Sequence, residues 1–123
     1  MNTSDDSLEQ LRRRLAEFAR VRNWEQFHSP KNLAMALIAE AAELVEHFQW
    51  LTEEQSRSLP EDKREAVRLE IADILIYLVR IADRLGIDPV AAAYDKIAIN
   101  EQRYPVERVR GDARRASEYG EGD

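Results

Sequence analysis

Two pairs of carboxylic acids with the same three-residue spacing stand out in this sequence of 123 residues. Glu40 and Glu43 lie in the stretch EAAELVEHFQW, and Glu70 and Asp73 lie in EIADILIYLVRIAD. Residues three apart on a helix are about 60° apart around its axis, so each pair would occupy one side of a helix. Both pairs flank apolar residues, where an unpaired carboxylate is costly. The pattern therefore indicates that something positively charged binds these acids.

A divalent metal ion is the counterion that fits this pattern best. If the two helices are antiparallel neighbours, the four carboxylates converge, repel one another and shift one another's pKa values. A hard cation relieves that repulsion, and all-oxygen ligation favours Mg²⁺, with Mn²⁺ as a substitute. A di-iron bundle would need Glu-x-x-His on two helices. The second acid pair has no such histidine, so this alternative is excluded.

Two plainer interpretations compete with the metal site. A single acid beside an apolar stripe is usually a solvated flank residue, and we assign Glu46, Glu65 and Asp83 to that class. Asp73 falls in the most apolar run of the chain, and it could form a structural ion pair with Arg80 or with another arginine. The repetition of the pair on two core-flanking faces favours the metal site.

Four helices are predicted to position these acids. Apolar residues recur with a period of 3.6, and no alternation of period two is present. Ser29 and Asp88 each precede a proline, as N-caps do, and Gly86 suits the end of a helix. An aromatic loop, NWEQFHSP, and a polar linker, LTEEQSRSLPED, separate the first three helices. The predicted helices span about residues 6–22, 30–50, 60–85 and 89–104.

These elements predict an all-α fold, a four-helix bundle in one domain at residues 1–105. Residues 106–123 are charged and contain most of the glycines, so we expect a tail that is mobile or lies on a partner subunit. Residues 71–82 are apolar nearly all round, which predicts a central helix covered on most sides. A lone bundle would leave apolar surface uncovered, so self-association is expected.

Composition excludes several classes of function. The chain carries 18 basic and 24 acidic residues, a net charge of −6, and no basic block that could bind a nucleic-acid backbone. The absence of cysteine excludes disulfides, thiol nucleophiles and cysteine-based zinc sites. The first residues, MNTSDDSLEQLRRR, lack the apolar core of a signal peptide, and no run reaches the roughly 18 apolar residues of a membrane span. A cytoplasmic location without membrane partners is expected.

The acid pairs also carry a family resemblance. E-x-x-E, 26 intervening residues and E-x-x-D resemble the signature of the MazG-like all-α nucleoside triphosphate pyrophosphohydrolases. Three segments are similar, in order, to the dCTP pyrophosphatase branch of that family, and together they extend over nearly the whole chain. They are NWEQFHSPKNLAMALIAEAAELVEHFQW, EIADILIYLVRIADRLGID and KIAINEQRYPVERVRGDAR.

The resemblance implies an activity and a set of metal ligands. Members use Mg²⁺ to hydrolyse nucleoside triphosphates between the α and β phosphates, giving a monophosphate and pyrophosphate. The branch implies dCTP or a related pyrimidine deoxynucleotide as the substrate. It also implies four residues that bind Mg²⁺ and form the catalytic site: Glu40, Glu43, Glu70 and Asp73. Either of the first two is the expected group that orients or deprotonates the attacking water.

Phosphate and base contacts follow from the same resemblance. Lys96 and Asn100 would contact phosphates, and they lie one turn apart on one helix face. The base pocket of this branch is aromatic, and flat side chains can enclose a base. The matching positions are Trp24, Phe27, His28, Trp50 and Tyr77, of which Phe27 stays open between core and pocket. His28 either bonds a base or caps the loop. The branch also implies a homo-oligomer, with a tetramer favoured and a dimer possible.

Two alternative functions remain at this point. The bundle could be a regulatory helical module that has lost turnover, although all four acids and the Lys/Asn pair are present. The same fold could also hydrolyse another pyrophosphate, such as phosphoribosyl-ATP or a modified nucleotide. The aromatic loop favours a pyrimidine-sized base without deciding between these substrates.

Overall fold

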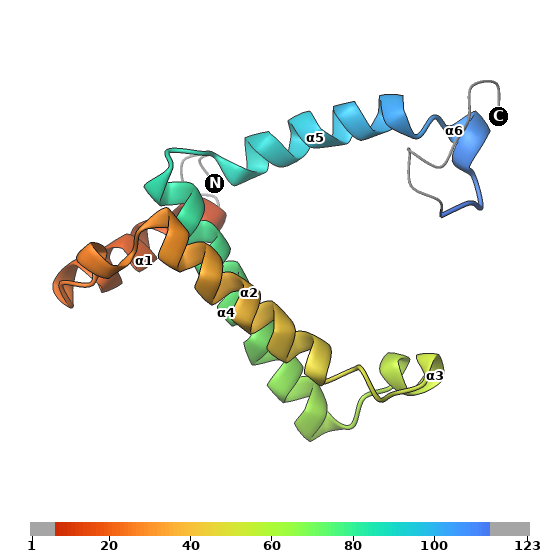
Figure 1. Ribbon diagram of the computed structural model, residues 1–123, viewed down its shortest axis with the longest axis horizontal. Helices are drawn as coiled ribbons and strands as arrows, with labels where there is room; N and C mark the ends of the chain where they lie inside the picture. The colour runs from red at the N-terminus through yellow and green to blue at the C-terminus, as the bar shows by residue number, and fades with distance from the viewer. Residues whose placement is uncertain (1–6, 114–123) are drawn as a thin grey trace. The chain divides into compact units, whose positions relative to one another are not determined.

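The computed structural model describes residues 7–113, and these residues form helices and no strand. The all-α prediction is therefore confirmed. The helices are α1 (Ser7–Val21), the short 3-10 helix η2 (Glu25–Phe27), α2 (Pro30–Glu46), α3 (Glu53–Arg57), α4 (Glu61–Arg84), α5 (Pro89–Arg103) and α6 (Val106–Val109) (Figure 1).

Side-chain caps start two of the long helices where the sequence predicts them. The Ser29 hydroxyl accepts a hydrogen bond from the Asn32 amide at 3.1 Å, and Pro30 follows as the first helical residue. Asp88 caps α5 by accepting from the amides of Val90 and Ala91. Such caps satisfy backbone donors that have no partner inside the helix.

The end of α4 also follows the sequence. Gly86 has a φ of 67°, a left-handed conformation that glycine adopts without strain. The Ile87 amide then donates to the carbonyl of Ala82 at 2.8 Å, as in the Schellman motif. This turn ends the helix that carries the second acid pair.

Two details of the predicted helices are wrong. α2 ends at Glu46 rather than near Trp50, because the amides of His47 and Phe48 bond to carbonyls three residues back, Phe48 to Val45 at 2.9 Å. Such bonds tighten the chain into turns. The polar linker contains α3, which starts with a reciprocal capping box between Thr52 and Gln55.

The tail predicted from residue 106 begins with α6. Its part from residue 114 onward lies outside the described residues, as does residue 6 at the start of the predicted first helix. By its internal contacts the chain divides into two compact units, Met1–Ile87 and Asp88–Asp123. No helix among residues 7–113 is long and apolar enough to cross a membrane.

In the first unit α2 and α4 lie side by side and antiparallel, and α1 packs against α4 (Figure 1). This is the arrangement that convergence of the acid pairs requires. Leu33 of α2, with 2% of its surface exposed, is the most buried large side chain of the described residues. The other buried apolar side chains are Ala19, Val67, Val79 and Ala82.

Both long helices of this unit keep apolar residues on the surface of the single chain. The expected covering of α4 on most sides is therefore not complete in one chain, because α1 and α2 leave part of it exposed. The exposed apolar side chains of this pair include Met35, Ile38 and Val45 on α2 and Ile71, Leu75 and Leu78 on α4.

Candidate metal and nucleotide site

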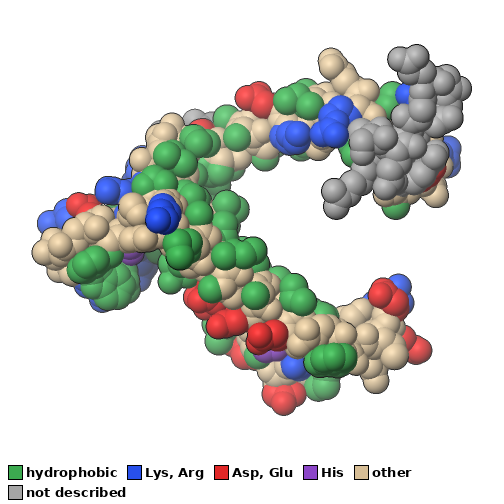
Figure 2. Space-filling model, viewed as in Figure 1, with side chains coloured by type: hydrophobic (Ala, Val, Ile, Leu, Met, Phe, Trp, Pro, Cys, Tyr) green, Lys and Arg blue, Asp and Glu red, His purple; other side chains and the backbone are tan. Residues whose placement is uncertain are grey.

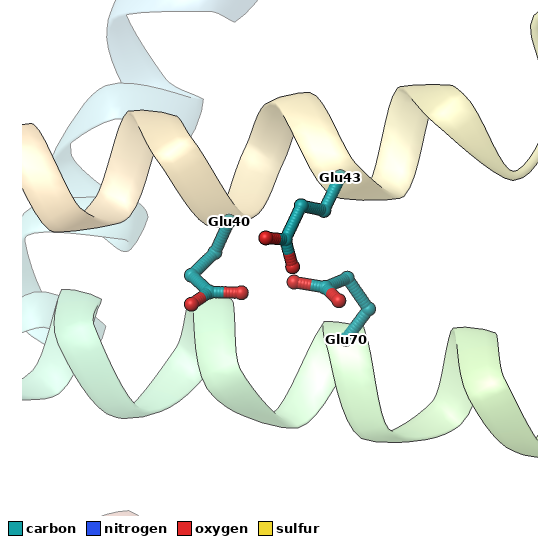
Figure 3. Close-up of side chains that lie close together, drawn as sticks. All are labelled: Glu40, Glu43 and Glu70. Atoms are coloured by element: carbon teal, nitrogen blue, oxygen red, sulfur yellow. The ribbon is translucent and has the colours of Figure 1, made fainter.

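Three of the predicted ligands meet between the paired helices. Glu40 and Glu43 project from α2 toward Glu70 of α4, and one carboxylate oxygen of each lies within 4.8 Å of the others (Figure 3). The spacing of three residues on α2 places both of its acids on the side that faces α4. On the face seen in Figure 2, acidic side chains gather along this helix pair and apolar groups border them.

Two oxygens of this cluster, Oε2 of Glu40 and Oε1 of Glu70, are shielded from solvent and have no hydrogen-bond partner among residues 7–113. Because neither carboxylate carries a proton when ionised, the two groups can only repel each other. The pKa of Glu40 is raised, first because a proton shared with Glu70 relieves that repulsion, and then because burial disfavours the charge. The charge of Asp73 adds to this effect.

Asp73 lies one turn after Glu70 on α4 and is exposed in the single chain, outside the three-acid cluster. The alternative ion pair with Arg80 does not form, because Arg80 bonds Asp83 at 3.1 Å instead. Asp83, predicted to be a solvated flank residue, is wrongly assigned. Only 22% of its side chain is exposed, and it also pairs with Arg12 of α1 at 3.1 Å.

The aromatic loop brings two of the predicted base-contacting residues together. The rings of Trp24 and His28 stand edge to face with 6.3 Å between their centroids. The ring of Phe18 also stands edge to face with Trp24, with 5.7 Å between the ring centroids. Phe27 is 59% exposed, so it is not a core residue of the single chain.

The other two predicted base contacts lie elsewhere in the first unit. Trp50 follows the end of α2 and is 87% exposed, whereas the aromatic loop precedes the start of that helix. A helix of 17 residues is about 26 Å long, so one chain does not bring Trp50 to the loop. Tyr77 lies on α4, one turn beyond Asp73 and half-buried.

The predicted phosphate contacts belong to the second unit. Lys96 and Asn100 lie one turn apart on α5, the first exposed and the second half-buried. Farther along the same helix, the guanidinium of Arg103 lies 5.7 Å from the Tyr104 ring centroid. This contact was not foreseen from the sequence.

The helical fold brings three carboxylates together between two antiparallel helices, in an arrangement that could hold a metal ion. The chain belongs to the MazG-like family, whose model matches residues 36–120. That range includes both acid pairs and the predicted phosphate contacts, Lys96 and Asn100.

Named relatives make the comparison more specific. The chain is 47% identical over 111 residues to mouse dCTP pyrophosphatase 1, covering 89% of this chain and 65% of that protein. The human protein of the same name is 42% identical over 120 residues, covering 96% of this chain and 71% of that protein. The chain therefore spans just under two thirds of the mouse relative's length.

A solved structure agrees with the fold. The crystal structure of a pyrophosphatase from Archaeoglobus fulgidus superposes with a TM-score of 0.78 at 38% sequence identity. The match covers 85% of this chain and 98% of the archaeal chain.

Proposed function

We propose that this protein hydrolyses deoxynucleoside triphosphates, with dCTP or a related pyrimidine nucleotide as the substrate. The bond cleaved would be the one between the α and β phosphates, giving a monophosphate and pyrophosphate. The observation that carries the proposal is the cluster of Glu40, Glu43 and Glu70, in which two shielded oxygens have no partner in the described part of the chain. The similarity to mouse and human dCTP pyrophosphatase 1 supports the choice of substrate.

The cluster suits a hard divalent cation. All its donors are carboxylate oxygens, which favours Mg²⁺ with Mn²⁺ as a substitute. Glu40, Glu43 and Glu70 would hold the metal, with Asp73 as a further ligand. When bound, the ion would neutralise phosphate charge and polarise the phosphoryl group for attack by water.

The chain's own residues would supply the remaining chemistry. Glu40 would orient or deprotonate the attacking water, as the family resemblance implies. Glu43 is the alternative, since it is the most exposed of the three acids. Lys96 and Asn100 would stabilise the pyrophosphate that leaves, through a charged and a neutral hydrogen-bond donor.

The base would be held by aromatic side chains of more than one copy of the chain. Trp24 and His28 lie before α2 and Trp50 lies after it, so a pocket using all three needs a second subunit. The exposed apolar residues of α2 and α4 give such a subunit a surface to cover. We therefore propose a homo-oligomer, with a tetramer favoured and a dimer possible. The cytoplasmic location stays a prediction.

A nucleotide panel tests this function. The protein is incubated with ribo- and deoxyribonucleoside triphosphates, with Mg²⁺ or with a chelator, and the products are separated by anion exchange. We expect monophosphate and pyrophosphate in equal amounts, only with Mg²⁺, and fastest from dCTP. Diphosphate and phosphate as the products would contradict cleavage between the α and β phosphates.

The same panel separates the alternatives. Turnover of a different nucleotide alone would keep the reaction and replace the substrate. If no nucleotide is turned over while Mn²⁺ still binds, the result favours a helical module without catalysis.

A further inference from the structure

A buried arginine joins the aromatic loop to α4. Arg80 has only 4% of its surface exposed, yet it carries a charge into the packed side of the helix. Its Nη1 donates to Oδ2 of Asp83 at 3.1 Å, and its Nε donates to Nδ1 of His28 at 3.4 Å. The guanidinium therefore divides its donors between a carboxylate on its own helix and a ring of the loop.

Two further arginines extend this connection. Nε of Arg84 donates to the backbone carbonyl of His28 at 3.1 Å, so α4 binds the loop at both the ring and the backbone. Arg12 of α1 donates to the other oxygen of Asp83 at 3.1 Å. We refer to these five residues, Arg12, His28, Arg80, Asp83 and Arg84, as the arginine network.

The network fixes the protonation of the ring. A guanidinium can only donate, so Nδ1 of His28 must accept, and in the neutral ring the hydrogen then lies on Nε2. Burial and the charges of Arg80 and Arg84 lower the pKa of His28, against a smaller opposite effect of Glu25. The ring is therefore a neutral donor at physiological pH, and Trp24 stands edge to face against it.

We propose that Arg80 is a positioning residue for nucleotide binding, which holds His28 as an Nε2–H donor and keeps Trp24 against it. This inference rests on the proposed function, in which both rings contact the base. Arg80 lies one turn after Tyr77 on α4, so the network ties the loop to the helix that carries Glu70. An Nε2–H group suits a carbonyl oxygen, such as the one at position 2 of a pyrimidine.

The first test observes the ring itself. The chain has two histidines, so long-range ¹H–¹⁵N NMR resolves the tautomer of His28 once the signals are assigned with His28→Gln. We expect the wild-type protein at pH 8 to show Nε2–H with an unprotonated Nδ1. Arg80→Met keeps an unbranched side chain but removes the donor, so it should give a mixture of tautomers and a higher pKa for His28.

Arg68→Met is the matched control. Arg68 lies on the same helix and pairs with an acid three residues away, as Arg80 does, but it is exposed and distant from the loop. This variant should leave the spectrum of His28 unchanged. The same tautomer in wild type and Arg80→Met would overturn the proposal.

The second test is kinetic. In Arg80→Met the neutral hydrogen bond from Nε2–H of His28 to the base would be lost. This loss is expected to raise KM for dCTP about 5- to 10-fold, with kcat within about twofold. Arg80→Lys, which keeps a donor, should recover part of the loss, and Arg68→Met should behave as wild type. Binding of Mn²⁺, measured by calorimetry without nucleotide, should be the same in all variants. An unchanged KM in Arg80→Met, or a fall in kcat alone, would contradict a role in positioning.

If Arg80→Met does not fold, Arg84→Met replaces it, because Arg84 is exposed and its loss releases the backbone of His28. It should also raise KM, and an unchanged KM would then overturn the proposal. If the wild-type protein turns over no nucleotide, the proposed function fails, whereas the tautomer spectrum still decides whether Arg80 fixes His28.

Discussion

α4 brings charge into its packed surface at two places, and the two places are completed differently. Near its end, Arg80 is buried and finds Asp83 and His28 within hydrogen-bond distance. Near its middle, Glu70 meets Glu40, and each keeps a shielded oxygen without a partner in the part of the chain that the structure describes. The buried guanidinium of the first region has hydrogen-bond partners within the chain, whereas the two acid oxygens of the second have none among the described residues. The contrast supports two proposals, that Arg80 positions the aromatic loop and that the acids bind a metal ion.

The largest expected effect comes from removing an acid of the three-acid cluster. Glu70→Gln preserves size but removes a proposed metal ligand, and we expect nucleotide hydrolysis to fall by at least about 100-fold at saturating Mg²⁺. Initial rates on dCTP would measure this effect.

Glu65→Gln serves as its control. Glu65 lies on the same helix, but it is exposed and paired with Arg68 at 2.7 Å. Its loss should change the rate by less than about twofold, because the net worth of an exposed pair is small. Equal losses in the two variants would show that any acid on α4 matters equally and would remove the contrast.

An intermediate effect, on the free energy of unfolding, is expected from breaking the arginine network. Asp83→Asn leaves the buried guanidinium of Arg80 without its carboxylate, which should lower the free energy of unfolding by about 2–3 kcal/mol. Urea denaturation followed by circular dichroism measures this change, and Glu65→Gln, which removes an exposed ion pair, should change the free energy of unfolding much less. A loss no greater than that of the control would mean that the arginine network adds little to stability.

The smallest effect is a pH dependence that should appear only without metal. The pKa of Glu40 in the folded protein is raised above its unfolded value, so the folded state prefers the protonated form. In chelator, the wild-type protein should therefore lose stability as pH rises from the unfolded pKa through the folded pKa. Glu40→Gln has no charge to bury and should lack this loss.

At each pH, the free energy of unfolding of the wild-type protein is subtracted from that of Glu40→Gln. Glu40→Gln should be more stable than wild type at pH 8 in chelator, and this advantage should disappear near pH 4. An advantage that stays constant with pH would have a cause other than the charge of Glu40.

Local signals in the sequence predict most of the helices. The caps at Ser29 and Asp88 and the turn at Gly86 act within a few residues, and all three have the predicted role. α3 was missed although the pattern from Thr52 to Gln55 is a local start signal, because a helix of five residues has almost no apolar periodicity. The capping pattern at Thr52 and Gln55 would therefore have been enough to predict the start of α3.

Long-range contacts explain what the sequence could not predict. The spacing of Glu40, Glu43 and Glu70 predicts convergence, since it requires only two antiparallel neighbours. The pairing of Asp83 with Arg12 joins residues 71 positions apart, and no local pattern reports it. The exposure of Asp73 has a related cause, because periodicity shows which side of a helix is apolar but not which neighbour covers it.

Binding of Mn²⁺ in the absence of nucleotide tests the central claim most directly. Free Mn²⁺ is followed by electron paramagnetic resonance while wild type, Glu70→Gln and Glu65→Gln are titrated. We predict that wild type and Glu65→Gln bind the ion with the same affinity and that Glu70→Gln binds it at least about 10-fold more weakly. Equal binding by all three proteins would contradict a metal site between α2 and α4.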